Sequence, residues 1–170
     1  MTTRSLAIQS LRDATVRFVE QCRRASAAQW GFRPTPGAWS MGDVAEHVAI
    51  ANQNILRRLA ASLAADPLQG RSPDVIDEEI PYLFYRGDEP PNVATPTGAW
   101  TSWAAAEAGF RDGAAALARW ADEASLDLRA HGAAHPVFGL MDGLQWLLFA
   151  AAHTERHRAQ LIALAREAAR

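Results

Sequence analysis

Residues 142–164 read DGLQWLLFAAAHTERHRAQLIAL, and this stretch decides the fold more than any other part of the chain. Its apolar residues recur at intervals of three and four, which is the period of a helix with one buried face. Asp142 stands directly before the apolar run and is a plausible N-cap. The inward line of this helix runs from Trp146 through His153 and His157. The pattern therefore predicts a core-facing helix that carries two histidines in the middle of its buried face.

Three further segments show the same helical period. They run from about Thr3 to Ala28, from Ser40 or Met41 to Ala65, and from Thr101 to Asp122. Ser40 is an N-cap candidate, and Asp43 suits the positive end of the helix dipole. Four amphipathic helices without a convincing strand pattern predict an all-α bundle. The connections are longer than in a minimal up-down bundle, so the order in which the helices pack stays open.

Residues 66–98 interrupt the helical pattern. This stretch holds six of the nine prolines and a cluster of acidic residues. A long connection in a compact domain is usually either functional or mobile. We expect a loop with one short helix that packs onto the domain and could wall a pocket.

The composition is that of a globular protein, with 49% hydrophobic and 21% charged residues. A length of 170 residues predicts a single domain spanning 1–170. The formal net charge of −2 argues against nucleic acid, which needs a strongly basic surface. All 17 basic residues are arginine, which excludes catalysis by a lysine. The single Cys22 excludes an internal disulfide and is expected to be a buried hydrophobic residue.

The first 18 residues, MTTRSLAIQSLRDATVRF, lack the apolar core and the cleavage site of a signal peptide. No apolar run approaches the roughly 18 residues that a membrane span requires. We therefore expect a soluble, cytoplasmic protein that binds neither nucleic acid nor a membrane.

Three of the five histidines are candidates to share a cation. His153 and His157 stand one helical turn apart on one face, and both can bind one divalent ion. His47 lies at the edge of the apolar face of the second long segment. Three imidazoles would leave coordination positions open, which is typical of a catalytic zinc-type site. The alternative is a polar patch in the core, in which the three histidines are hydrogen-bonded and bind no metal.

The sequence HTERH differs from the zincin motif HExxH, because Thr154 stands where the catalytic glutamate would follow the first histidine. Glu155 and its neighbour Arg156 are expected to face solvent or a partner helix. Gln160 lies on the same side as His157. It could hold a ligand or a substrate, but a hydrogen bond within the bundle is the favoured interpretation.

Taken in order, these motifs resemble the DinB-like (YfiT-like) metalloprotein superfamily. The first match begins at Trp30 and continues through the Trp-Ser pair at residues 39–40 to His47, two turns into the second long helix. The second is the sequence HPVFG at residues 135–139, which leads into the last helix. The third is the closing His-x-x-x-His-x-x-Gln pattern at residues 153–160.

The resemblance implies an antiparallel four-helix bundle with crossover connections, a single DinB-like domain. It also implies that His47, His153 and His157 bind one divalent ion, most often zinc or nickel in relatives. Characterised relatives include bacillithiol S-transferases and a mycothiol-dependent maleylpyruvate isomerase, in which the metal activates a low-molecular-weight thiol. A small-molecule substrate and a homodimer are further implications, and DNA binding is not implied.

Other functions of the same site stay open. A metal-dependent hydrolase would use water where the thiol would bind, and a non-catalytic stress-response protein would use the metal for stability. The catalytic groups are unknown beyond possible assistance from Gln160.

Several residues are assigned ordinary roles. His131 and His135 stay outside the ligand set, and a turn-stabilising role is favoured for them. Most of the tryptophans are expected in the core, although Trp39 or Trp146 could stack on a substrate. Exposed helix positions are expected for three arginines, one of which could bind the carboxylate of a thiol cofactor. These arginines are Arg57, Arg58 and Arg158.

Overall fold

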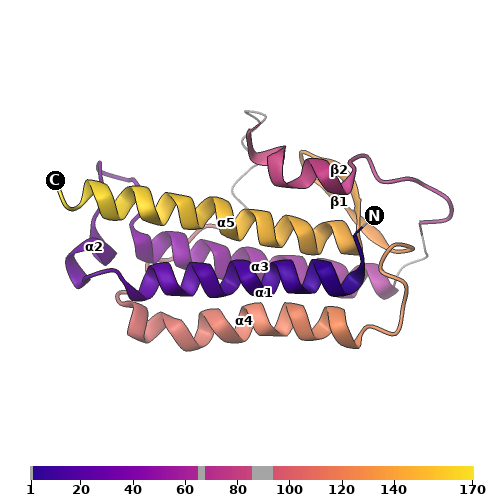
Figure 1. Ribbon diagram of the computed structural model, residues 1–170, viewed down its shortest axis with the longest axis horizontal. Coiled ribbons are helices and arrows are strands. Elements are labelled where there is room, and N and C mark those ends of the chain that lie inside the picture. The colour runs from indigo at the N-terminus through magenta and orange to yellow at the C-terminus, as the bar shows by residue number, and fades with distance from the viewer. Residues whose placement is uncertain (1, 65–67, 86–93) are drawn as a thin grey trace.

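The computed structural model describes residues 2–64, 68–85 and 94–170. Four long helices lie side by side and form a bundle (Figure 1). They are α1 (Arg4–Arg23), α3 (Met41–Ala64), α4 (Trp103–Glu123) and α5 (Gly143–Glu167). The predicted four-helix bundle is therefore confirmed. Residue 65, the predicted end of the second segment, lies outside the described residues.

The four helices are not all antiparallel to their neighbours. Helices α1 and α3 each pack against both α4 and α5. Helices α1 and α5 run in one direction and α3 and α4 in the other, so each helix has one parallel and one antiparallel neighbour (Figure 1). This order arises because the chain returns between α3 and α4 to the end of the bundle where α3 begins. There Gly42 lies so close to the Trp100 carbonyl that a Cβ would approach it to 2.6 Å.

Helix starts follow the capping residues that the sequence suggests. The backbone N–H of Asp43 donates to Ser40 Oγ at 3.2 Å, and the Asp43 carboxylate accepts from the Ser40 backbone N–H at 2.7 Å. Asp142 and Gln145 make the same reciprocal pair at the start of α5. Both N-caps predicted from the sequence are confirmed, and each satisfies backbone donors that the first turn leaves unpaired.

The helical period predicted one continuous helix for the first segment, but the structure has two. Helix α1 ends at Arg23, and the short helix α2 (Ala27–Gly31) follows after a break. Ser26 causes the restart, because it forms a capping box with Gln29. The break turns the chain so that Trp30 packs into the core and donates from its indole Nε1 to the Trp100 carbonyl at 2.8 Å.

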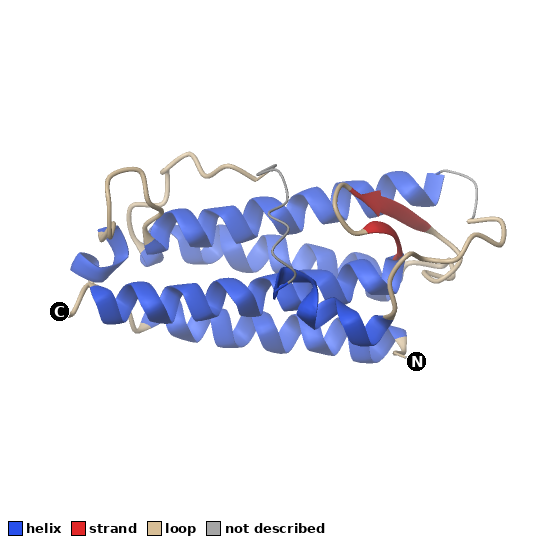
Figure 2. Ribbon diagram, turned by 90° about the horizontal axis from the view of Figure 1, so that it is seen from above, coloured by secondary structure: helices blue, strands red, loops and turns tan. Residues whose placement is uncertain are grey.

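The structure adds one short hairpin that the sequence pattern did not indicate. Residues Gly132–His135 (β1) and Gly139–Asp142 (β2) pair as a short antiparallel hairpin (Figure 2). Gly139 adopts a φ of 76°, which favours glycine at the end of the turn. The hairpin leads directly into α5, because Asp142 is both the last residue of β2 and the N-cap of the helix.

The long stretch between α3 and α4 contains the short helix that was expected. It is a 3₁₀ helix, η1 (Asp77–Tyr85), which packs against α5. Val75, Ile80 and Leu83 are buried there, so this part of the stretch packs onto the bundle as predicted. The remainder of the prediction for residues 66–67 and 86–93 lies outside the described residues.

An ion network joins η1 to the start of α5. Arg129 donates from Nη2 to Asp77 Oδ2 at 2.6 Å and from Nη1 to Asp142 Oδ2 at 2.8 Å. Its Nη2 also donates to the Thr2 carbonyl. These hydrogen bonds with Arg129 hold the pKa of Asp77 well below its usual value. At Asp142 burial has the larger effect and raises the pKa, although Arg129 opposes it.

Two apolar clusters form the core, one at each half of the bundle. Cys22 is fully buried in the cluster that surrounds Trp30 and Phe110, as predicted. Burial raises the pKa of its thiol, which keeps the thiol protonated. Among the helices of the described residues, none is long and apolar enough to cross a membrane.

Candidate metal centre

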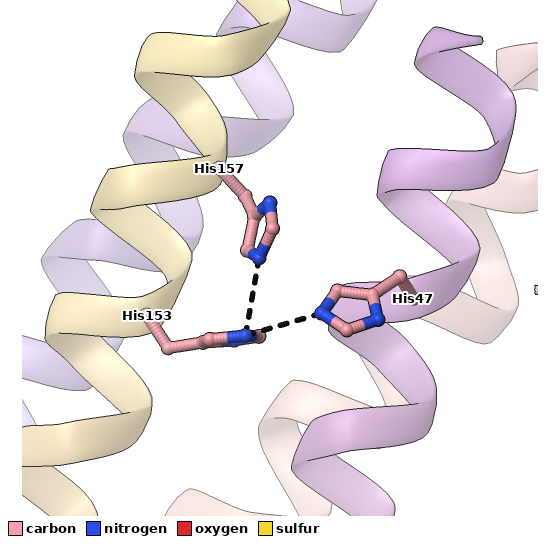
Figure 3. Close-up of side chains that lie close together, drawn as sticks. All are labelled: His47, His153 and His157. Atoms are coloured by element: carbon pink, nitrogen blue, oxygen red, sulfur yellow. Dashed lines mark hydrogen bonds between the residues drawn. The ribbon is translucent and has the colours of Figure 1, made fainter. Parts of the chain in front are cut away.

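The three predicted histidines meet between the two helices that carry them. His47 projects from α3, and His153 and His157 project from neighbouring turns of α5 (Figure 3). The Nε2 atom of His153 lies 3.2 Å from Nε2 of His47 and 3.1 Å from Nε2 of His157. The three ligand atoms all lie within 4.8 Å of one another. The antiparallel contact between α3 and α5 therefore brings the predicted residues to one point.

The outer nitrogens of two rings are already engaged. His47 Nδ1 lies 2.8 Å from the Ala94 carbonyl oxygen, which can only accept, so Nδ1 carries the hydrogen. His157 Nδ1 donates in the same way to Gln160 Oε1 at 2.8 Å. In the neutral rings Nε2 is then an acceptor. Two lone pairs consequently face His153 Nε2, which can donate a hydrogen to only one of them.

The donor set fits a divalent cation. With metal–nitrogen distances of about 2.0–2.1 Å, two ligands of a tetrahedral site lie roughly 3.3 Å apart. The two Nε2 separations of 3.2 and 3.1 Å are close to that value. A hydrogen from His153 Nε2 can serve only one of the two facing acceptors, whereas a cation would bind all three Nε2 atoms. Neutral imidazole is also a preferred ligand of zinc and nickel.

Burial keeps all three rings neutral. It lowers the pKa of His157 to about 4 and also lowers the pKa of His153 well below the usual histidine value. Burial also lowers the pKa of His47, and the nearby positive charge of Arg156 adds to the effect. A metal ligand must be deprotonated, so the site needs no proton release to bind a cation at neutral pH.

Aromatic rings enclose the histidines. Trp39 lies against His47, with ring centroids 4.7 Å apart, and Phe149 stacks on His153 at 5.9 Å. A pocket is lined by Arg33, Gly37, Trp39, Asp43 and residues 95–98, and of these residues Trp39 contacts His47. The end of the long connecting stretch thus walls a pocket, as predicted.

The neighbours of the histidine pair on α5 lie as expected. Gln160 makes the bundle hydrogen bond that the sequence favoured, and its partner is His157 itself. Glu155 accepts from Arg17 of α1 and from Arg158, so it faces a partner helix and not the histidines.

Two other arginines make structural contacts at the surface of the bundle. Arg57 donates to Asn54, while Arg58 donates to the Ala134 carbonyl and lies over the Trp146 ring. Trp146 itself is buried and donates from Nε1 to the Ala133 carbonyl, which places it in the core.

The remaining two histidines lie away from the cluster. His131 precedes the hairpin, and its carbonyl accepts from the Gly143 backbone N–H at 2.9 Å. His135 stabilises the turn, because its Nδ1 accepts from the backbone N–H groups of Val137 and Phe138. Burial lowers the pKa of His135 to about 4, which keeps that nitrogen free to accept. The turn-stabilising interpretation of this residue agrees with the contacts.

Sequence reasoning missed one group that contacts the site and one group that holds the segment behind it. The Ala94 carbonyl binds His47, and Glu46, the residue before His47, binds the backbone beyond Ala94. Glu46 is only 6% exposed. An acidic residue next to a candidate ligand in an amphipathic helix was the available signal, but nothing in the sequence indicates which loop it would contact.

Comparison with known proteins agrees with this architecture. A family model described as the DinB superfamily matches residues 7–161. The chain is also similar to a solved structure described as that of TT2238, a four-helix bundle protein. The identity is 23%, the TM-score is 0.63, and the match covers 95% of this chain and 99% of that chain. This likeness concerns the fold alone. No curated protein matches the chain.

Proposed function

The chain belongs to the DinB superfamily, and from that premise we propose that it is a metal-dependent enzyme in which His47, His153 and His157 bind one divalent ion. The ion is zinc or nickel. The reaction is transfer or isomerisation that uses a low-molecular-weight thiol as cosubstrate.

One observation carries the proposal, namely the convergence of three imidazole Nε2 atoms inside the bundle. A purely structural polar cluster normally pairs donors with acceptors. This cluster has a surplus of acceptors, because His47 and His157 both use their Nδ1 hydrogens outside it. The surplus supports a positively charged ligand.

The protein contributes position and environment. His153 and His157 keep their spacing because they lie one turn apart on α5, and the Ala94 and Gln160 oxygens orient the other two rings. Phe149 and Trp39 limit the access of water to the rings. When bound, a divalent ion lowers the pKa of a thiol that enters its open positions and favours the nucleophilic thiolate.

The protein's own cysteine does not compete for that role. Cys22 is fully buried in an apolar cluster, and burial raises the pKa of its thiol. Any thiol that reaches the proposed metal must therefore come from solution.

The test begins with elemental analysis of protein purified without a metal-chelating tag. We expect one equivalent of zinc or nickel per chain in the wild type and none in His153→Ala. Turnover of an electrophile such as a chlorodinitrobenzene is then measured with and without an added small thiol. Thiol-dependent turnover that is lost in His153→Ala supports the proposal.

Other outcomes separate the competing functions. Hydrolysis of a model ester without any thiol would replace the transferase with a hydrolase at the same site. Stoichiometric metal without turnover would leave a metal-stabilised binding protein. Absence of metal after reconstitution with zinc and with nickel would overturn the metal centre itself.

A further inference from the structure

The residue next to the first metal-ligand candidate is a buried carboxylate that the proposed function does not use. Glu46 lies on α3 and is 6% exposed. Its Oε1 accepts from the Thr97 hydroxyl at 2.5 Å, and its Oε2 accepts from the Gly98 backbone N–H at 2.9 Å. Both carboxylate oxygens therefore bind one short segment, which contains residues 94–98.

The same segment contacts His47. The Ala94 carbonyl lies 2.8 Å from His47 Nδ1, three residues before the threonine that Glu46 binds. Consecutive residues of α3 thus hold the two ends of the segment. Gly98 has a φ of 79°, so the segment turns there in a conformation that favours glycine.

We propose that Glu46 is a positioning residue for His47, because it fixes the 94–98 segment whose Ala94 carbonyl keeps the hydrogen of His47 on Nδ1. With that hydrogen on Nδ1, the lone pair of Nε2 points to His153 and His157. Groups that hydrogen-bond the outer nitrogen of a ligand histidine orient the ring and select its tautomer. Here the orienting group is a loop carbonyl, and Glu46 acts through the loop.

The inference rests on the proposed function in one respect, since it takes His47 as a ligand. Its alternative is that Glu46 contributes only to stability. A carboxylate elsewhere in the bundle provides a matched control. Asp77 also holds a connecting segment, and the histidines do not contact it.

The experiment compares Glu46→Ala, Glu46→Gln and Asp77→Ala. Zinc affinity is measured by competition with a chromophoric chelator. Nitrogen-15 NMR of the metal-free proteins reports which nitrogen of His47 carries the hydrogen. We expect zinc affinity to fall by about 10–100-fold in Glu46→Ala, which is the usual effect of losing an orienting partner.

The two other variants sharpen the result. Glutamine can still accept from Gly98, so Glu46→Gln should keep most of the affinity and a His47 hydrogen on Nδ1. Asp77→Ala should be destabilised but should bind zinc like the wild type. In Glu46→Ala the metal-free His47 should become a mixture of both tautomers.

Two results would overturn the inference. One is a Glu46→Ala protein whose zinc affinity falls no more than that of Asp77→Ala. The other is a metal-free Glu46→Ala protein that keeps the hydrogen of His47 on Nδ1. If the wild type binds neither zinc nor nickel, the proposed function fails, whereas the tautomer measurement still decides the role of Glu46.

Discussion

The bundle buries two polar clusters that differ in how their charges and hydrogen bonds are satisfied. In the ion network, Arg129 pairs with Asp77 and Asp142, so each charge has an opposite charge against it. In the histidine cluster, His47 and His157 direct acceptors at His153, and the described residues place no carboxylate among the three rings. The charges of the first cluster are paired within the protein, while the second cluster lacks a positive charge.

This difference separates a structural cluster from a candidate site. Burial of polar groups is unfavourable unless partners are present, so a cluster with surplus acceptors indicates a ligand that completes it. The ion network connects the chain near Thr2, η1 and α5, which is a structural role. The three histidines belong to α3 and α5, and those helices already pack through apolar residues.

The largest expected effect comes from removing one ligand candidate. We expect His153→Ala to weaken zinc binding by about two to three hundredfold, since one of three ligands supplies roughly a third of a binding free energy of order 10 kcal/mol. Isothermal titration with a competing chelator measures this loss. His131→Ala, which removes a buried histidine outside the cluster, should keep wild-type affinity. Equal losses in both variants would contradict the assignment.

Disrupting the ion network should lower the stability of the protein and leave its zinc affinity unchanged. Arg129→Ala leaves the buried Asp142 and the partly buried Asp77 without their cation, and we expect the free energy of unfolding to fall by about 3 kcal/mol. Urea denaturation measures the change. Arg111→Ala removes an exposed pair with Glu107 and should leave the free energy of unfolding close to that of the wild type. A large loss of zinc affinity in Arg129→Ala would mean that the two clusters are coupled.

Acid should affect the two clusters in different pH ranges. The pKa of His157 is lowered from 6.5 to about 4, so the unfolded chain binds a proton that the folded chain excludes. The stability of the metal-free protein is therefore complete above about pH 6.5 and falls as the pH approaches 4. His157 alone contributes up to about 3 kcal/mol of this loss.

Asp77 loses its contribution to stability at lower pH than His157 does. Its pKa is lowered, so its contribution is present above its unfolded value near 4 and is lost only at lower pH. Urea denaturation at a series of pH values distinguishes the two steps, and His157→Gln should flatten only the step above pH 4. An unchanged stability of the wild type between pH 7 and 5 would contradict the buried, neutral histidines.

The smallest effect concerns the outer hydrogen bond of His157. Gln160→Leu removes the acceptor for His157 Nδ1, and we expect zinc affinity to fall about tenfold. Gln160→Glu keeps an acceptor at this position and should bind zinc at least as tightly as the wild type. The same competition titration measures both. A leucine variant with full affinity would assign Gln160 to bundle packing alone.

The histidine geometry could be predicted because it depends on helical spacing. His153 and His157 share a face wherever α5 forms, and the Asp142 cap marks where it begins. His47 could be placed near them only through the family pattern, since the distance between two helices is not encoded in local periodicity.

Other features could not be predicted from the same signals. The hairpin strands have four residues each, too few to show an alternating pattern, and β1 is rich in small residues. The break after α1 depends on the Ser26–Gln29 capping box, which competes with continued helical periodicity. The contact of Ala94 with His47 involves a backbone carbonyl, which no side-chain pattern reveals.

The full burial of Cys22 provides an internal reporter of the fold. A thiol-specific reagent can reach this sulfur only when α1 separates from the rest of the bundle, because the side chain is 0% exposed. With no second cysteine in the chain, the rate of labelling would measure how often the native protein opens. A cation that links α3 to α5 would slow that rate if opening α1 also requires those helices to part.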